Sequence, residues 1–176
     1  MELRPLLKSF VDTSWFISLP TMGVFYGYIG WQHLVNPSFF LDIMPSIIPY
    51  PDAAVLWSGI WEICIAVFLL PSRTRRFAAW MAFALLILVS PVNINMCFDS
   101  EICQILGFSK AEAALRLFFQ IPLLLIARWH AVGLKHGWYS LVCSALFFPT
   151  ILYFIQLLKN VPKPSRKRQI TCSHRC

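Results

Sequence analysis

Five long apolar segments constrain what this chain can fold into. They are Trp15–Leu34, Ala53–Leu70, Phe77–Met96, Ala111–Ala127 and Trp138–Leu158. A helix needs about 20 residues to cross the ~30 Å hydrocarbon layer of a bilayer, and these segments are close to that length. The sequence therefore predicts an all-α, polytopic membrane bundle. Four helices within residues 15–130 form its core, and a fifth helix covers residues 138–158.

The balance of charged and apolar residues supports a membrane environment. Apolar residues make up 58% of the 176 positions and charged residues only 13%, against about a quarter in soluble domains. The net charge of +7 comes largely from Lys and Arg beside the apolar segments, as is typical of membrane edges. We therefore expect a lipid bilayer as the partner of this chain and no nucleic acid.

The positions of Lys and Arg predict a cytoplasmic N-terminus. Residues 1–14 then form a cytoplasmic segment, and the first apolar segment is a retained helix that no signal peptidase removes. Most basic residues near the segments fall inside: Arg4, Lys8, Arg73, Arg75, Arg76, Arg128 and Lys135. Lys110 falls outside. Apolar length favours a fifth crossing, which would put the basic tail, residues 159–176, outside; charge opposes it and favours a segment that lies flat. We expect crossing.

The connection Val35–Asp52 differs from the other loops because it contains four prolines and several large apolar residues. Proline at this density prevents a regular helix, while the apolar side chains disfavour free solvation. We expect this segment either to lie along the membrane surface or to fold over the bundle as a lid.

Polar residues inside the apolar segments are the candidates for function, because polar groups are costly in lipid. Glu62 shares a helical face with the small residues Ser58, Gly59 and Ala66. It is either a proton-accepting or ligand-binding carboxyl, or a neutral, hydrogen-bonded core residue. Arg116 could pair with Glu62 across the bundle, or locally with Glu112 one turn before it.

Two asparagines follow a proline near the end of the third segment. Asn93 and Asn95 either satisfy backbone groups that Pro91 leaves free or hydrogen-bond a substrate. In the expected orientation, six polar residues from four helices fall in the outer half of the bilayer: His33, Glu62, Asn93, Asn95, Arg116 and Gln120. They predict one ligand-binding pocket open to the outer side.

Glycines and cysteines give secondary expectations. Gly23, Gly27 and Gly30 line one side of the first helix, a pattern typical of close helix packing. Cys97 and Cys103 flank a short outer loop and are candidates for a disulfide or a redox pair. In the basic tail, Cys172 and Cys176 are candidates for palmitoylation. No spacing suits a metal site, and no nucleotide-binding or hydrolase motif occurs, so no catalytic residue is assigned.

Six strings in order resemble the DoxX-like family of small membrane proteins. They are G-W-Q-H-L-V-N-P from Gly30, D-I-M-P-S-I-I-P from Asp42, S-G-I-W-E-I from Ser58, L-P-S-R-T-R-R-F-A-A-W from Leu70, S-P-V-N-I-N-M from Ser90 and R-L-F-F-Q-I-P from Arg116. The resemblance implies a four-helix membrane bundle and makes the six polar residues family features. Residues 138–176 extend past the four helices usual in that family.

The family takes its name from a subunit of a membrane thiosulfate:quinone oxidoreductase, so the resemblance suggests a quinone or another lipophilic redox partner. The leading hypothesis is a membrane protein that binds such a partner in the outer pocket and is not an enzyme on its own. One alternative is a non-catalytic subunit or assembly factor with a membrane protein partner or a second copy of itself. The other is a small-metabolite carrier that alternates access around Glu62 and Arg116.

Overall fold

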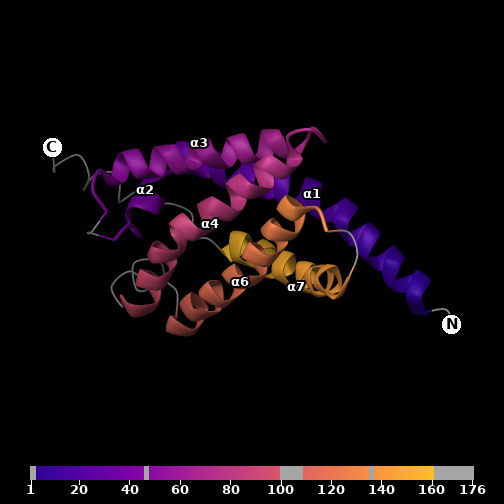
Figure 1. The fold of residues 1–176 in the computed structure, drawn as a ribbon. Coiled ribbons are helices and arrows are strands. Elements are labelled where there is room, and N and C mark those ends of the chain that lie inside the picture. The colour runs from indigo at the N-terminus through magenta and orange to yellow at the C-terminus, as the bar shows by residue number, and fades with distance from the viewer. Residues whose placement is uncertain (1–2, 46–47, 100–108, 135–136, 161–176) are drawn as a thin grey trace, which may run out of the picture.

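The computed structural model describes residues 3–45, 48–99, 109–134 and 137–160, and within these ranges the chain forms helices and no strand. Figure 1 shows the helices arranged side by side, with the N-terminal part of α1 extending beyond the bundle. The described helices are α1 (Leu3–Val35), α2 (Pro37–Leu41), α3 (Pro51–Leu69), α4 (Arg75–Phe98), α6 (Lys110–Val132) and α7 (Trp138–Asn160). The prediction of an all-α fold is confirmed.

Three of these helices are long and apolar enough to cross a membrane. They are α3, α4 and the Trp138–Gln156 part of α7. Only 22–33% of the residues in their most apolar windows are buried inside the molecule. Their composition is compatible with a membrane protein, whereas membrane crossing by α1 and α6 stays a prediction.

Large apolar side chains face outward on the long helices. Phe16 and Val24 on α1, Trp57 on α3, Leu88 on α4 and Phe118 on α6 each expose more than half of their surface. Monomeric soluble proteins rarely expose so much contiguous apolar surface. A lipid environment would cover these side chains.

Two helix starts show how local sequence sets the boundaries. α1 begins at Leu3, twelve residues before the expected Trp15, so most of residues 1–14 is helical. Pro5 lies in the first turn, where proline is tolerated. α6 begins with a capping box, in which Ser109 Oγ accepts from the Glu112 N–H at 3.2 Å and Glu112 Oε2 accepts from the Ser109 N–H at 2.7 Å.

The proline-rich connection contains a short helix, so the expectation that it holds no regular helix was wrong. Pro37 begins α2 and Pro51 begins α3. Proline suits the first position of a helix because its fixed φ is helical and that N–H has no intrahelical partner. α2 packs against α1 and α3, so this connection folds back over the bundle.

The closest helix contact is between α1 and α3, and it depends on glycine. A Cβ atom at Gly30 would lie 2.7 Å from the Gly59 carbonyl oxygen, and one at Gly59 would lie 2.5 Å from the Cβ of His33. The expected packing role of the α1 glycines fits this contact. α4 packs against α3 and α6, while α7 packs against α6 and α1.

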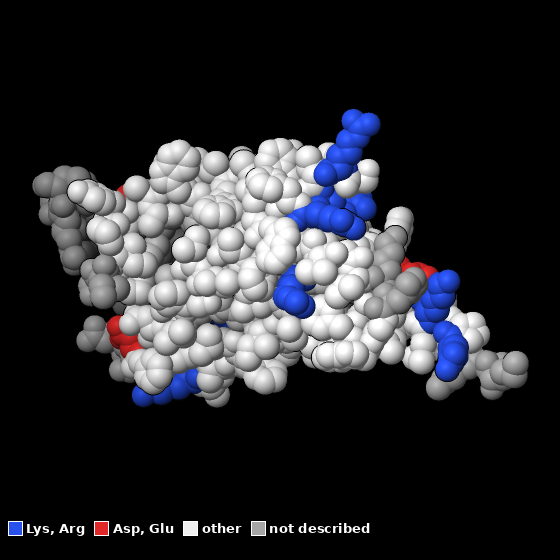
Figure 2. Space-filling model, in the orientation of Figure 1, with Lys and Arg blue, Asp and Glu red and all other residues white. Residues whose placement is uncertain are grey.

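Charge is unevenly distributed over the surface. Figure 2 shows a mostly uncharged surface, with most visible Lys and Arg side chains on the half that contains the start of α1 and the turn between α3 and α4. The arrangement suits the expected orientation, in which that end faces the cytoplasm.

Candidate functional site

His33 and Glu62 form a buried pair between α1 and α3. The Nε2 atom of His33 lies 3.6 Å from Oε2 of Glu62, and the two side chains are only 11% and 12% exposed. This distance exceeds the usual hydrogen-bond range of about 2.7–3.2 Å. Glu62 Oε2 is buried without a hydrogen-bond partner in the described part of the chain. The pair is therefore close enough for strong electrostatic coupling but can accept a further polar group.

The second ring nitrogen of His33 fixes its tautomer. Nδ1 lies 3.0 Å from the Val55 carbonyl oxygen and 2.9 Å from Ser58 Oγ, and the Ser58 hydroxyl donates to the same carbonyl. Because a carbonyl oxygen only accepts, Nδ1 must carry a proton.

Because Nδ1 keeps its proton, the two atoms of the pair that can gain or lose one are Nε2 of His33 and the carboxyl of Glu62. A buried carboxylate beside a neutral histidine would be an uncompensated charge, which is costly in an apolar environment. The pair therefore holds one proton, either on Glu62 or on Nε2 of His33. This is a group that can give a proton to a ligand oxygen or take one from it.

The proline-rich connection covers this pair. The ring of Phe40 on α2 stacks on His33, with 3.6 Å between ring centroids and 28° between ring planes. Phe39 packs edge-on against Phe40, and both lie beside the buried residues Ile43 and Met96. Of the two expected positions of this connection, the packing favours a lid over the bundle.

A second polar group joins α4 to α6. Asn93 Nδ2 donates to Gln120 Oε1, while Gln120 Nε2 donates to the Leu86 carbonyl and to Ser90 Oγ, each at 2.7 Å. Ser90 Oγ also donates to the Leu86 carbonyl at 2.8 Å. The Leu86 carbonyl thus accepts side-chain hydrogen bonds from both Gln120 and Ser90, whereas the carbonyl that Pro91 leaves without a helical donor is that of Ile87. Both the oxygen and the nitrogen of the Gln120 amide thus make hydrogen bonds within the protein.

The other two candidate residues do not join these groups. Asn95 makes none of the hydrogen bonds that link Asn93 to Gln120. Neither expected pairing of Arg116 occurs among the described residues, because Glu62 faces His33 and Glu112 bonds to Ser109. No hydrogen bond or ion pair within the described ranges joins the α1–α3 pair to the α4–α6 group. Among the described residues these side chains therefore form two polar groups, and the single outer pocket stays a prediction.

Sequence reasoning missed a buried contact between α1 and α6. Ser18 Oγ lies 2.7 Å from Nε2 of His130, and the two residues are 0% and 1% exposed. The Trp15 ring packs against His130, with 4.3 Å between centroids. His130 lies three residues beyond the expected end of its segment and so was not considered. Had the helix been extended to Val132, the sequence would have placed His130 in its last turn and made it a further polar candidate.

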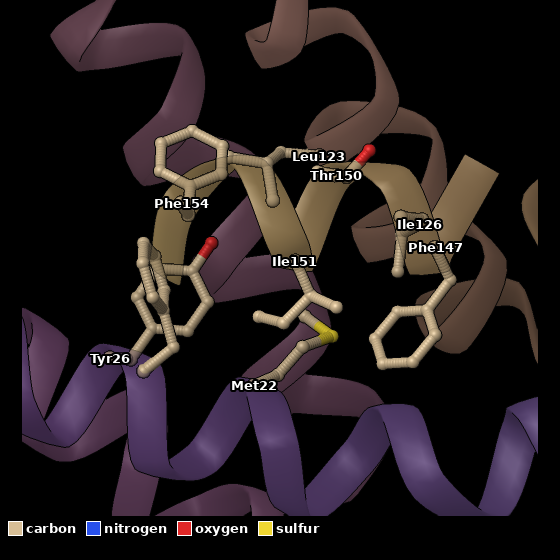
Figure 3. Close-up of a pocket in the computed structure, with 9 residues that line it drawn as sticks. Met22, Tyr26, Leu123, Ile126, Phe147, Thr150, Ile151 and Phe154 are labelled. Carbon is tan, nitrogen blue, oxygen red and sulfur yellow. The ribbon is translucent and has the colours of Figure 1, made fainter. Parts of the chain in front are cut away.

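A small cavity lies apart from the His33–Glu62 pair. It is walled by side chains of α1, α6 and α7, including Met22, Tyr26 and Phe147 (Figure 3). Its volume is about 20 Å³, enough for roughly one water molecule. Pockets for small molecules measure about 300–1,000 Å³, so a quinone ring does not fit there.

The described residues contain no group of three or more His, Cys, Asp or Glu side chains that could hold a metal ion. Cys97 Sγ donates to the Asn93 carbonyl, and Cys143 Sγ donates to the Leu125 carbonyl. The expected partner of Cys97, Cys103, lies outside the described residues, as do Cys172 and Cys176.

Fold and site together define an all-helical protein with three helices apolar enough to cross a membrane and a buried histidine–glutamate pair. The family model described as "Domain of unknown function (DUF8561)" matches residues 22–131, which is more than half of the chain. The chain belongs to this DUF8561 family. The match includes both polar groups and His130, while α7 lies outside it. Neither the curated proteins nor the solved structures contain a significant match.

Proposed function

We propose that this chain is a DoxX-like, multi-pass integral membrane protein that binds a small lipophilic partner at the His33–Glu62 pair. The partner carries a carbonyl or hydroxyl oxygen, as a quinone does. The observation that carries the proposal is the buried Oε2 atom of Glu62, which has no hydrogen-bond partner among the described residues and lies 3.6 Å from Nε2 of His33.

The chemistry of the pair suits an oxygen-bearing ligand. A ligand oxygen within reach of both atoms would complete the hydrogen bonding of Oε2 and share the single proton of the pair. Phe40 stacks on the histidine from α2, so entry requires this short helix to move aside. The ring of Phe40 would then offer a flat apolar surface to the ligand.

The membrane topology is part of this proposal. α1, α3, α4 and α6 form a four-helix DoxX-like core, α7 is a fifth crossing, and the N-terminus is cytoplasmic. Support comes from the three apolar helices and from the concentration of Lys and Arg at one end (Figure 2). The His33–Glu62 pair then lies in the outer half of the bilayer.

Extraction of bound lipophiles tests the binding function. Protein purified in mild detergent is extracted with organic solvent, and the extract is analysed by mass spectrometry for stoichiometric lipophiles. We expect a ligand in the parent protein and its loss in Glu62→Gln. The matched control is Glu112→Gln, the same chemical change in an exposed capping box that glutamine also supports. Absence of ligand from the parent, or equal ligand in Glu62→Gln, contradicts the proposal.

A non-catalytic subunit or assembly factor is a second candidate. The Asn93–Gln120 group favours it, because its polar atoms bond within the protein and hold α4 against α6. Polar groups that only fix helix packing need no ligand. Co-purification of a stoichiometric membrane protein, together with unchanged Glu62→Gln stability, would favour this reading.

A further inference from the structure

One face of α1 carries buried polar side chains along most of the helix. Ser14, Ser18 and Tyr26 are 0%, 0% and 3% exposed, and His33 closes the series. Residues four apart on a helix lie on the same face, and Met22 fills the remaining position between Ser18 and Tyr26. From Ser14 to His33 the helix rises about 28 Å, close to the thickness of the hydrocarbon layer.

At one end of this face lies the Ser18–His130 contact. The Ser18 hydroxyl donates to the Trp15 carbonyl at 3.1 Å, so the hydrogen on Nε2 of His130 points to Ser18 Oγ. Nδ1 of His130 is then an acceptor without a hydrogen, and within the described ranges it is buried without a hydrogen-bond partner. This atom can take up a proton while Nε2 releases one toward Ser18.

At the other end lies the His33–Glu62 pair, and Tyr26 lies about two turns before His33 on the same helix. Tyr26 precedes Gly30 by about one turn, and a Cβ at Gly30 would lie 3.0 Å from the Cβ of Glu62. In the part of the chain that the structure describes, the Tyr26 hydroxyl and Glu62 Oε2 are both buried without a hydrogen-bond partner. Along α1, Tyr26 therefore lies between Met22 and the turn at Gly30 that packs against Glu62.

Half of the unpartnered buried polar atoms in the described residues lie on this line or beside it. Among the described residues, six buried side-chain atoms lack a hydrogen-bond partner: Tyr26 Oη, Trp61 Nε1, Glu62 Oε2, His130 Nδ1, Ser144 Oγ and Tyr153 Oη. Three of the six belong to the series on α1 or to its direct neighbours. Buried polar atoms without a hydrogen-bond partner are rare in native proteins, so their presence needs an explanation.

The cavity of Figure 3 lies at the gap in this series. Ser18 and Tyr26 are eight residues apart, which is about 12 Å along the helix. Met22 and Tyr26 line the cavity together with residues of α6 and α7 (Figure 3). Its walls are apolar and its volume of about 20 Å³ holds roughly one water. In this conformation, the series is therefore interrupted at Met22.

We propose that this face of α1 is a proton path across the membrane, closed at Met22. A proton enters at Nδ1 of His130 as Nε2 gives one to Ser18 Oγ, and Ser18 passes one on through water in the opened cavity. Tyr26 then relays it to Glu62, and as that proton arrives Nε2 of His33 releases the proton that the pair already held to the outer side, which α2 and its Phe40 cover until they move aside. Each step forms one O–H or N–H bond and breaks another, so no oxidant or reductant takes part. The path rests on the proposed crossing of the membrane by α1.

Proton flux into vesicles tests the path. Full-length protein is reconstituted in liposomes that contain a pH-sensitive dye, and valinomycin with a potassium gradient sets the potential. We expect Met22→Ser to raise the flux at least tenfold over the parent, because a smaller polar side chain admits water. The matched control, Val24→Ser, makes a similar change on the exposed face of α1 and should leave the flux unchanged.

A second substitution shows whether the flux follows this line. Tyr26→Phe or Ser18→Ala, each added to Met22→Ser, should return the flux to the parent level, with gel filtration confirming a folded protein. Flux that does not rise in folded Met22→Ser overturns the proposal. So does a raised flux that persists in both double variants, because it would be an unspecific leak.

Ligand extraction separates this path from the proposed binding function. Met22→Ser and Ser18→Ala leave the His33–Glu62 pair intact, so they should keep any ligand found in the parent. If the protein retains the ligand but Met22→Ser does not raise the proton flux, the path is overturned while the binding function stands. Gated flux in a parent without ligand supports the path and contradicts the binding function.

Discussion

The imidazole of His33 lies between the Val55 carbonyl, 3.0 Å from Nδ1, and the Glu62 carboxyl, 3.6 Å from Nε2. The carbonyl requires a proton on Nδ1, so the charge of the pair depends on the Nε2 side alone. The histidine can therefore keep α1 bonded to α3 while the proton of the pair moves between Nε2 and the carboxyl.

The histidine tautomer gives a first prediction. In ¹⁵N-labelled protein, we expect Nδ1 of His33 to be protonated in the parent and in Ser58→Ala, because the bond to the Val55 carbonyl remains. Glu62→Gln removes the group that shares its proton with Nε2, so the Nε2 shift should change while the Nδ1 shift stays. A parent protein with only Nε2 protonated would contradict the assignment.

The glycine contact between α1 and α3 gives a second prediction. Gly30→Ala places a Cβ 2.7 Å from the Gly59 carbonyl, whereas Gly23→Ala places one 3.8 Å from the Ala66 carbonyl, an ordinary contact. We expect Gly30→Ala to lower the free energy of unfolding by about 1–3 kcal/mol, the usual cost of overpacking. Gly23→Ala serves as the control. Unfolding in mixed micelles measures both, and equal effects would exclude close packing at Gly30 as the cause.

The helices could be predicted from sequence because apolar length and proline position act locally. Each expected segment lies within an observed helix, apart from Leu70, which caps α3. The start of α1 was placed too late, since Lys8 and Asp12 end the apolar pattern without ending the helix. Backbone hydrogen bonding continues through outward-facing polar residues, so hydropathy alone cannot locate that boundary.

The partners of the polar residues were harder to predict than the residues themselves. A polar side chain in an apolar segment stands out because burial is costly, which identified Glu62 and Gln120. Partner choice depends on the rotation of each helix against its neighbours, which one sequence does not encode locally. Gln120 bonds to the Leu86 backbone carbonyl, a group with no side-chain signal. Arg116 was expected to pair with Glu62 or with Glu112, but Glu62 lies against His33 and Glu112 accepts from Ser109.

The bond between Asn93 and Gln120 gives a third prediction. A double-mutant cycle with Asn93→Leu and Gln120→Leu should show a coupling energy of about 0.6–1.7 kcal/mol, the range found for hydrogen bonds between membrane helices. In the control cycle, Asn95→Leu with Gln120→Leu should be additive within about 0.5 kcal/mol, since those side chains do not bond. Additivity in the first cycle would mean that the bond contributes nothing to stability.

Membrane topology gives the last prediction, which tests the basis of both proposals. α4 has 24 residues and is about 36 Å long, more than the ~30 Å hydrocarbon layer. Arg73 precedes this helix and Lys110 follows its outer loop, so the two positions should lie on opposite sides of the membrane. In a background without native cysteines, an impermeant maleimide should label Lys110→Cys in intact cells. Arg73→Cys should react only after permeabilisation.

A third position extends this test to α7. Gln156→Cys lies near the end of that helix and should be labelled in intact cells if α7 crosses, because its start is expected on the cytoplasmic side. Labelling only after permeabilisation would mean that α7 does not cross and that the basic tail stays inside, as the charge pattern favours. Equal labelling of Arg73→Cys and Lys110→Cys would go further. It would exclude a crossing by α4 and with it an outer-leaflet site at His33 and Glu62.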